Sequence, residues 1–246
     1  FITLIHNNIN LMKNLIKLIF RKFGFEISKR NLYSFDYKWL KDYNIESIID
    51  VGANQGQFAI LISKYFPKAK IYSFEPITEV YERLLKNVDG LNILPFNLGL
   101  GDKEEIKTIN HWIQGDASSS ILEMSNIHIR NFPHVKNSIS ENIAITTLND
   151  FFSKNDIDSN IYLKIDVQGF EDRVLSGGNK ILSKIKIIQV ESSFVSLYND
   201  QKLFDYIFTY LTNNNFDFVG VADVIFDKDS GIPLFCDAFY INKQLK

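Results

Sequence analysis

The sequence predicts a doubly wound α/β domain built on a mostly parallel sheet. Strand-like apolar segments alternate with amphipathic helical segments along most of its 246 residues. The segment 47–51 is almost continuous in β-branched residues, as expected of a strand buried on both faces of a parallel sheet. A turn containing Gly52 and Gly56 follows it and leads into a helical pattern. A strand, a bare turn and a helix N-terminus together are typical of a nucleotide site.

The end of the chain has the pattern of a β-hairpin. Apolar segments at 224–226 and 238–241 flank a polar turn at 227–231. One of these strands is expected to join the sheet antiparallel to the others. Before this hairpin, the alternation of strand and helix patterns predicts strands at 46–51, 69–75, 92–98, 161–166, 186–191 and 216–220. It predicts helices at 57–66, 77–87, 170–183 and 201–213.

The alternation lapses in an insertion at about 103–146. Residues 104–109 fit a short strand, but 114–142 are dominated by Ser, Asn, Asp and His and predict a long connection. Long connections of this kind often bind ligands, so we expect acceptor recognition here. The insertion's histidines show no compact zinc pattern, and no metal site is expected; they are His111, His128 and His134.

The position of Glu75 also supports a nucleotide site. Glu75 ends the next predicted strand, nineteen positions after Gly56, close to the spacing of a ribose-binding carboxylate. The alternative is an acid that stabilises the helix N-terminus beside Pro76. The dinucleotide fingerprint G-x-G-x-x-G fits poorly, because its second and third glycines would fall on Asn54 and Gln57.

The first 44 residues are expected to stand apart from the domain at 45–246. Residues 9–23 form a basic amphipathic pattern that is too short and too charged to span a membrane. Packing against the domain or a partner is the preferred interpretation, and contact with a membrane surface is the alternative. The aromatic segment 28–44 predicts a loop and a short helix that cover one edge of the sheet.

Composition indicates an ordinary globular protein. Apolar residues make up 46% of the chain, the formal charge is −2 and the isoelectric point is near 6.1. This charge argues against a dedicated nucleic-acid binder, which usually carries a strongly basic face. Cys236 is the single cysteine and lies among apolar residues, so we expect it in the core. A cytoplasmic location is expected, with membrane association through 9–23 as a variant.

Several segments occur together in an order that resembles a known family. The segments Ile-Asp-Val-Gly-Ala-Asn-Gln-Gly-Gln-Phe at 49–58 and Phe-Glu-Pro at 74–76 resemble the FkbM family of S-adenosylmethionine-dependent methyltransferases. The resemblance covers about residues 45–241 and implies a seven-stranded, Rossmann-like class I methyltransferase sheet with an antiparallel strand. Further segments in the family's order are 99–102, 118–120, 147–150, 163–171 and 189–191.

The resemblance implies S-adenosylmethionine as the cofactor. Its amino-acid end is expected to lie on the turn at 52–56, its ribose on Glu75 and its adenine beside Asp102, just after the third predicted strand. The full set of expected cofactor-binding residues is Asp50, Gly52, Ala53, Asn54, Gly56, Gln57, Glu75, Pro76, Asp102 and Ser119.

Two carboxylates are candidates for catalysis. Asp166 and Glu191 end neighbouring predicted strands, so both could face one crevice, and their proximity would raise the proton affinity of one of them. We favour Asp166 as the general base or acceptor-orienting group, with Glu191 second and His134 as a further alternative. Asp166 could instead bind the donor's amino group or cap the helix that begins near Phe170.

The resemblance also implies the type of acceptor. FkbM-like proteins are associated with O-methylation of sugars and natural products. Enzymes that methylate nucleic-acid bases often carry an Asn/Asp-Pro-Pro-aromatic turn where this chain has Asp-Val-Gln-Gly at 166–169. The expected partner is therefore a hydroxyl-bearing small molecule or glycan and not a nucleic acid. The alternatives are a nicotinamide-dependent oxidoreductase on a similar fold and a non-catalytic binding domain.

Overall fold

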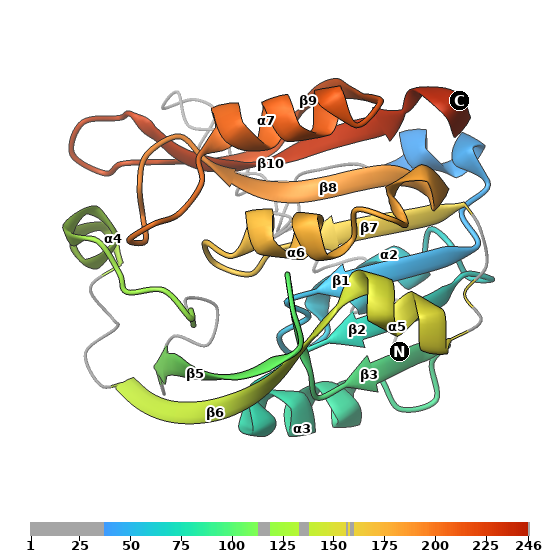
Figure 1. Ribbon diagram of the computed structural model, residues 1–246, viewed down its shortest axis with the longest axis horizontal. Helices are drawn as coiled ribbons and strands as arrows, with labels where there is room; N and C mark the ends of the chain where they lie inside the picture. Colours follow the sequence, from blue (N-terminus) through green and yellow to red (C-terminus); the bar gives the residue numbers. More distant parts are fainter. Residues whose placement is uncertain (1–36, 113–118, 133–137, 156, 158–159, 246) are drawn as a thin grey trace, which may run out of the picture. The chain divides into compact units, whose positions relative to one another are not determined.

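The chain divides into two compact units, Phe1–Phe35 and Asp36–Lys246. All described residues belong to the second unit. The helix predicted at 9–23 lies outside the described residues, whereas the short helix predicted within 28–44 is present as a 3₁₀ helix, η1 (Tyr37–Tyr43). The computed structural model describes residues 37–112, 119–132, 138–155, 157 and 160–245 (Figure 1).

The core of this unit is a seven-stranded sheet in the order β3-β2-β1-β7-β8-β10-β9. Neighbouring strands are parallel except β10, which pairs antiparallel with both β8 and β9. The predicted doubly wound, mostly parallel sheet with an antiparallel strand is therefore confirmed. Its strands are β1 (Ser47–Val51), β2 (Lys70–Phe74), β3 (Ile93–Phe96), β7 (Ile161–Ile165), β8 (Ile185–Ser193), β9 (Phe216–Phe226) and β10 (Pro233–Asn242).

Helices cover both faces of the sheet, which explains why β1 and β7 are buried at every position. On the near face of Figure 1, α5, α6 and α7 pack on side chains such as Ile49 and Leu163. On the other face, Phe58 of α2 meets Tyr162 edge-on, with ring centroids 5.9 Å apart. The helices are α2 (Gln57–Ser63), α3 (Thr78–Asn87), α5 (Leu148–Lys154), α6 (Glu171–Gly177) and α7 (Phe204–Asn213).

Two predicted elements differ from the structure. The helix expected at 170–183 ends at Gly177, because two consecutive glycines follow its last apolar turn and Gly178 is its C-cap. The strands expected at 216–220 and 224–226 are one continuous strand, β9, whose register against β10 shifts at three places. These irregularities explain why its alternation is broken in the sequence.

The insertion contains a second sheet that the sequence analysis did not predict in full. Its strands are β4 (Gly99–Gly101), β5 (Glu105–Trp112) and β6 (Ser138–Thr147), in the order β4-β6-β5. The strand expected near 104–109 is present in β5, but β6 begins within the residues expected to form a long loop. Ile143 and Ile145 are buried, whereas Asn142 and Ala144 beside them are exposed, a period-2 signal hidden by the surrounding Ser and Asn residues.

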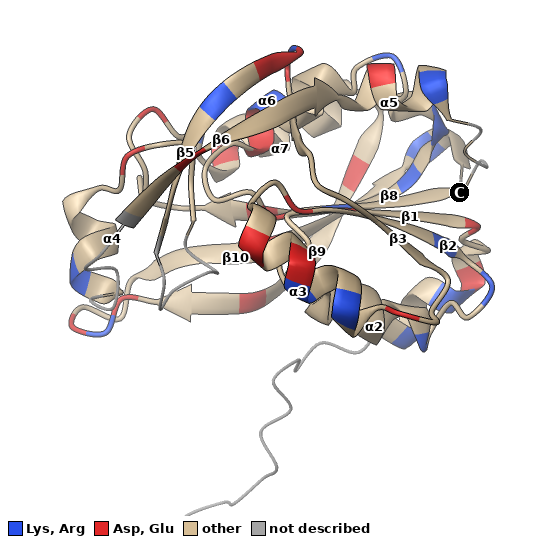
Figure 2. Cartoon of the chain, turned by 90° about the horizontal axis from the view of Figure 1, so that it is seen from below, with Lys and Arg blue, Asp and Glu red and all other residues tan. Residues whose placement is uncertain are grey.

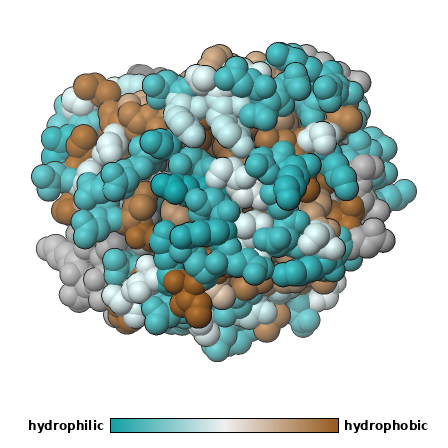
Figure 3. All heavy atoms as spheres, in the orientation of Figure 1, coloured by the Kyte–Doolittle hydropathy of each residue, from teal (hydrophilic) through white to brown (hydrophobic). Residues whose placement is uncertain are grey.

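The surface is mixed in character. Charged residues lie mainly on helices, loops and strand ends (Figure 2). Hydrophilic and hydrophobic residues are interspersed on the face that carries α5, α6 and α7 (Figure 3). Within the part of the chain that the structure describes, no helix is both long and apolar enough to cross a membrane.

The end of α6 provides a test of this packing. A Cβ atom on Gly177 would lie 1.9 Å from the backbone oxygen of Gly101 in β4. We expect Gly177→Ala to lower the free energy of unfolding by roughly 1–3 kcal/mol, because either α6 or β4 must move. Urea denaturation measures this. The neighbouring, partly exposed Ser176→Ala is the control, and equal stability of the two variants would contradict the close approach.

Candidate functional site

A cavity opens where β1, β2 and β7 end at the carboxyl edge of the sheet, the edge at which open α/β sheets bind ligands. It encloses about 720 Å³ of empty space, including its mouth. Apolar side chains make up much of its wall, and a few polar groups converge on it, as in small-molecule sites. The apolar lining includes Leu98, Leu100, Ile109, Ile121 and Ile143.

The cavity brings together half of the residues expected to bind a cofactor. The predicted base, Asp166, lines it as well. The predicted residues in its wall are Gly52, Asn54, Glu75, Pro76 and Ser119. The predicted residues that lie outside the lining formed by the described part of the chain are Asp50, Ala53, Gly56, Gln57 and Asp102.

The turn after β1 requires glycine. Gly52 has φ of 79°, and a Cβ atom there would lie 1.8 Å from the backbone oxygen of Asp166. The backbone N–H groups of Gly52 and Ala53 both donate to the Phe74 oxygen, at 3.1 and 2.9 Å. These contacts hold the turn against the ends of β2 and β7, so its main chain forms part of the cavity wall.

Glu75 is fixed at this wall by two backbone groups. It is 6% exposed, its Oε2 accepts from the Asn54 N–H at 3.0 Å and its Oε1 from the Ile77 N–H at 3.0 Å. Ile77 is the N-cap of α3, so Glu75 also fills the role at a helix N-terminus that the sequence left open. The carboxylate is therefore oriented in advance of any ligand.

Two polar atoms in the wall suit a polar ligand. Asn54 Oδ1 and Ser119 Oγ are buried and have no hydrogen-bond partner among the residues that the structure describes. Buried polar atoms are nearly always hydrogen-bonded in native proteins. Asn54 also has φ of 48°, which holds its side chain on a left-handed turn. A bound molecule with hydrogen-bonding groups would satisfy both atoms.

Asp50 lies under the turn and contacts a lysine. Lys164 Nζ is 3.5 Å from Asp50 Oδ1, 3.3 Å from Asp166 Oδ2 and 3.4 Å from the Gly52 oxygen. Burial raises the pKa of Asp50 above its usual value, and Lys164 offsets part of this effect. Asp50 was predicted to bind the cofactor directly, but it is buried in this ion pair and can act on the cavity only through the turn.

The two predicted catalytic carboxylates meet through a glutamine. Gln168 Nε2 donates to Asp166 Oδ1 at 2.8 Å and to Glu191 Oε1 at 3.3 Å. Burial first, and then the charge of Asp166, raise the pKa of Glu191 well above its usual value. The expected pair of neighbouring strand-end carboxylates is thus present, although only Asp166 reaches the cavity wall.

A third carboxylate lies beside them. Glu171 is 3% exposed, and its Oε1 accepts from the Val167 N–H at 3.2 Å and the Gly169 N–H at 3.0 Å. Burial raises its pKa to about 7, against the opposing effect of these hydrogen bonds. Glu171 was not among the site residues predicted from the sequence, although an acid that begins a helix shortly after the strand-end Asp166 was a visible signal.

Asp102 has a different place from the one expected. It follows β4 of the second sheet, and its Oδ2 lies 3.2 Å from Nη1 of Arg173 in α6. The prediction treated 92–98 as the third strand and Asp102 as the residue just after it. The strand β3 ends at Phe96 and the chain then enters the second sheet, so Asp102 lies in this ion pair and not in the cavity wall.

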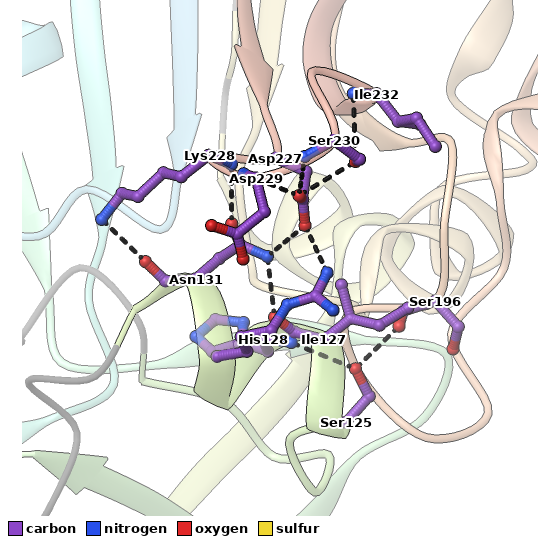
Figure 4. Close-up of polar contacts among 11 residues, drawn as sticks. Ser125, Ile127, His128, Asn131, Ser196, Asp227, Lys228, Asp229, Ser230 and Ile232 are labelled. Carbon is purple, nitrogen blue, oxygen red and sulfur yellow. Dashed lines mark hydrogen bonds and ion pairs between the residues drawn. The ribbon is translucent and has the colours of Figure 1, made fainter.

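We call residues 119–132 the acceptor segment, because the sequence predicts acceptor recognition in the insertion. They include α4 (Asn126–Asn131), which a buried aspartate joins to the β9–β10 hairpin. Asp227 Oδ2 accepts from Arg130 Nη2 at 2.5 Å and from Asn131 Nδ2 at 2.8 Å, and its Oδ1 accepts from the Ser230 N–H at 2.8 Å (Figure 4). At the other end of α4, Ser125 Oγ donates to the Ser196 oxygen at 2.8 Å. The segment is thus fixed at both ends.

The histidines of the insertion differ in setting. His128 on α4 is 2% exposed, and burial lowers its pKa to about 4, so it is neutral at physiological pH. His111 Nε2 lies 3.9 Å from Glu141 Oε2. His134, the alternative base, lies outside the described residues. Across the described ranges, no group of three His, Cys, Asp or Glu side chains is placed to hold a metal ion.

The fold and site together define a class of enzyme. Rossmann-like methyltransferases have a seven-stranded sheet with one antiparallel strand. They also have a glycine turn after β1 and an acid after β2, as this chain does. The structure resembles a methyltransferase FkbM from Methylobacillus flagellatus, with a TM-score of 0.50 and 13% identity over 80% of this chain and 43% of that one. Residues 50–218 match the methyltransferase FkbM domain model, and the chain belongs to that family.

Two characterised proteins show similar sequences. One is the 2-O-methyltransferase NoeI of Sinorhizobium fredii, 28% identical over 63% of this chain and 66% of its own length. The other is the hexuronic acid methyltransferase AglP of Haloferax volcanii, 27% identical over 58% of this chain and 54% of its own length. The chain therefore spans about two thirds of the first relative and about half of the second.

The raised pKa of Glu171 predicts a pH-dependent stability. Its pKa is about 7 in the folded state and near 4.5 in the unfolded state, so the folded protein binds the proton more tightly. The contribution of Glu171 to the free energy of unfolding is fully present below pH 4.5. It is lost as the pH rises to about 7, and the loss is about 3 kcal/mol at most. We expect Glu171→Gln to reduce this decline in the free energy of unfolding, measured by urea denaturation at pH 5 and 8. An identical decline in Glu171→Gln and in the exposed control Glu82→Gln would contradict the assignment.

Proposed function

We propose that this chain transfers a methyl group from S-adenosylmethionine to a hydroxyl group of a sugar, a glycan or a natural product. Membership of the FkbM family supports the methyltransferase class over a nicotinamide-dependent oxidoreductase or a non-catalytic binding domain. The relatives named as a 2-O-methyltransferase and a hexuronic acid methyltransferase support a sugar hydroxyl as the acceptor. The observation that carries the proposal is the cavity that places Glu75, Asn54 and Asp166 in one wall.

The residues of the cavity fit this cofactor. Glu75, already oriented by two backbone N–H groups, would accept from the two ribose hydroxyls. Asn54 Oδ1 lacks a partner among the described residues and would accept from the donor's amino group. Gly52 has no side chain, so the cofactor could approach the main chain closely at this turn. Leu98 and Leu100 line the cavity and would form an apolar wall for the adenine, in place of Asp102.

Asp166 is the proposed base. S-adenosylmethionine, when bound, supplies an electrophilic methyl group. Asp166 reaches the cavity with 34% of its side chain exposed, so it can accept the proton of an acceptor hydroxyl. Glu191 is the second candidate, because its raised pKa suits proton transfer, although it lies behind Gln168. The segment around α4 would orient the acceptor, as loops and insertions at this edge often do.

A direct experiment tests the reaction. The protein is incubated with methyl-labelled S-adenosylmethionine and a panel of glycosides, lipid-linked sugars and small hydroxylated metabolites, and mass spectrometry detects the labelled product. We expect transfer to a hydroxyl group. Calorimetry of the cofactor provides an independent arm. If a nicotinamide dinucleotide binds while S-adenosylmethionine and S-adenosylhomocysteine do not bind at millimolar concentration, the proposal is wrong.

The role of Glu75 predicts a change in cofactor affinity. Glu75→Ala removes the acceptor for two hydroxyl donors, so we expect the binding free energy of S-adenosylhomocysteine to weaken by roughly 1.5–3 kcal/mol in calorimetry. Glu79→Ala is the matched control, because Glu79 lies on the exposed side of α3 and pairs with Arg83. An affinity of Glu75→Ala equal to that of the control would move the ribose to another part of the cavity.

The role of Asp166 predicts a change in turnover. Asp166→Asn keeps the size and much of the hydrogen bonding of the side chain but removes its basicity. We expect turnover to fall by roughly 10²-fold or more, with the affinity for S-adenosylhomocysteine within a few fold of the parent and the affinity for S-adenosylmethionine reduced by no more than about tenfold. The exposed Asp205→Asn in α7 is the control. Turnover of Asp166→Asn within threefold of the parent, on an acceptor identified by the screen, would exclude Asp166 as the base.

A further inference from the structure

Gln168 makes hydrogen bonds to four different parts of the chain. Its Nε2 donates to Asp166 after β7 at 2.8 Å and to Glu191 of β8 at 3.3 and 3.4 Å. Its Oε1 accepts from the Tyr198 hydroxyl at 2.7 Å, and its backbone oxygen accepts from Ser120 Oγ in the insertion at 2.6 Å. The residue therefore joins two strand ends, the loop after β8 and the acceptor segment.

The backbone at this position is held in an uncommon conformation. Gln168 has φ of 56°, in the left-handed region that few residues other than glycine, Asn and Asp adopt. Gly169 follows with φ of 99°, and a Cβ atom there would lie 3.0 Å from Tyr198 Cδ2. Such conformations cost of order 1–3 kcal/mol and concentrate at functional sites. This turn presses the main chain against Tyr198 and directs the Gln168 side chain between the two carboxylates.

Tyr198 fixes which end of the amide faces the carboxylates. Its side chain is buried, and burial holds its pKa well above the usual value, so its hydroxyl stays protonated and donates. Because the Tyr198 hydroxyl donates, the Gln168 amide must present its oxygen to Tyr198. The two N–H bonds of Gln168 then point to Asp166 and Glu191. Without the tyrosine hydroxyl, the amide could rotate and present its oxygen to a carboxylate.

The acceptor segment contacts the same tyrosine. The ring of His128 on α4 lies 4.9 Å from the Tyr198 ring, and an isolated β-bridge joins Met124 to Tyr198. Ser120 contacts Gln168 directly. The residues that would meet the acceptor are thus connected to Asp166 through one side chain and its tyrosine partner.

We propose that Gln168 is a positioning residue whose amide holds the Asp166 carboxylate at the cavity wall, in an orientation set by the Tyr198 hydroxyl. This inference rests on the proposed function, because it assumes that the cavity binds S-adenosylmethionine. A carboxylate held there interacts with the positive sulfonium of S-adenosylmethionine but has little interaction with the neutral sulfur of S-adenosylhomocysteine. The ratio of the two dissociation constants therefore reports the position of Asp166 without any acceptor.

The experiment measures both dissociation constants by calorimetry. Relative to the parent, we expect Asp166→Asn to shift the ratio against S-adenosylmethionine by roughly 3–10-fold. Gln168→Met, which keeps the side-chain length but removes the amide, should shift it in the same direction by a similar factor. Tyr198→Phe should shift it by a smaller factor, because the amide remains but is no longer fixed. Tyr210→Phe, which loses a hydroxyl bonded to the Leu175 oxygen away from the cavity, should leave the ratio unchanged.

The possible outcomes separate this inference from the function on which it rests. A loss of affinity for both ligands by the same factor in Gln168→Met and Tyr198→Phe would indicate a structural role only and overturn the inference. If Asp166→Asn shifts the ratio but neither of these variants does, the inference fails while the site assignment stands. If neither ligand binds the parent, the proposed function fails and this inference with it. Circular dichroism checks that each variant is folded, and Tyr198→Phe is the milder change if Gln168→Met does not fold.

Discussion

The contacts of Lys164 are the constraint on which the cavity depends. This buried amine lies within 3.5 Å of Asp50, Asp166 and the backbone oxygen of Gly52, so it joins β1, β7 and the glycine turn at one point. Burial alone would lower its pKa, but Asp166 and Asp50 outweigh that effect and hold the pKa above its usual value. Removal of the amine would leave a buried carboxylate unpaired, which typically costs about 3–5 kcal/mol. The positions of the turn and of the Asp166 carboxylate therefore depend on one side chain.

The same lysine belongs to a polar row that crosses the apolar sheet. Ser73, Asp50, Lys164 and Gln189 are aligned in register on β2, β1, β7 and β8, and all four are buried. The row continues through the bond from Gln189 to Asp237 on β10. A slip of one residue in any of these strands would turn its polar group to the opposite, apolar face. The row therefore helps to specify the register of the sheet as well as the site.

Local patterns in the sequence predicted all seven strands of the main sheet, although β9 was divided in two, and part of the site. The β-branched run at 47–51, the two glycines and Glu75 each carry their signal within a few residues, and each lies at the cavity or its supporting turn. The surroundings of Gln168 and α4 depend on contacts between residues that are far apart in the sequence. Gln168 meets Tyr198 thirty positions later, and Asp227 meets Arg130 across ninety-seven. No periodicity reports such contacts, and the strand β6 was hidden by its polar flanks.

The position of β10 has a consequence for the order in which the fold forms. The strand β10, at Pro233–Asn242, follows β9 in the sequence but lies between β8 and β9 in the sheet. Among the described residues, β9 is bonded to the sheet only through β10. During synthesis, β9 is therefore made before the strand with which it pairs. It cannot join the sheet until β10 has been made, because β10 lies between it and β8. The five parallel strands β3, β2, β1, β7 and β8 can assemble before that point. The hairpin tip that holds α4 can form only afterwards, so the contacts that fix α4 are completed after the strands that carry the cavity.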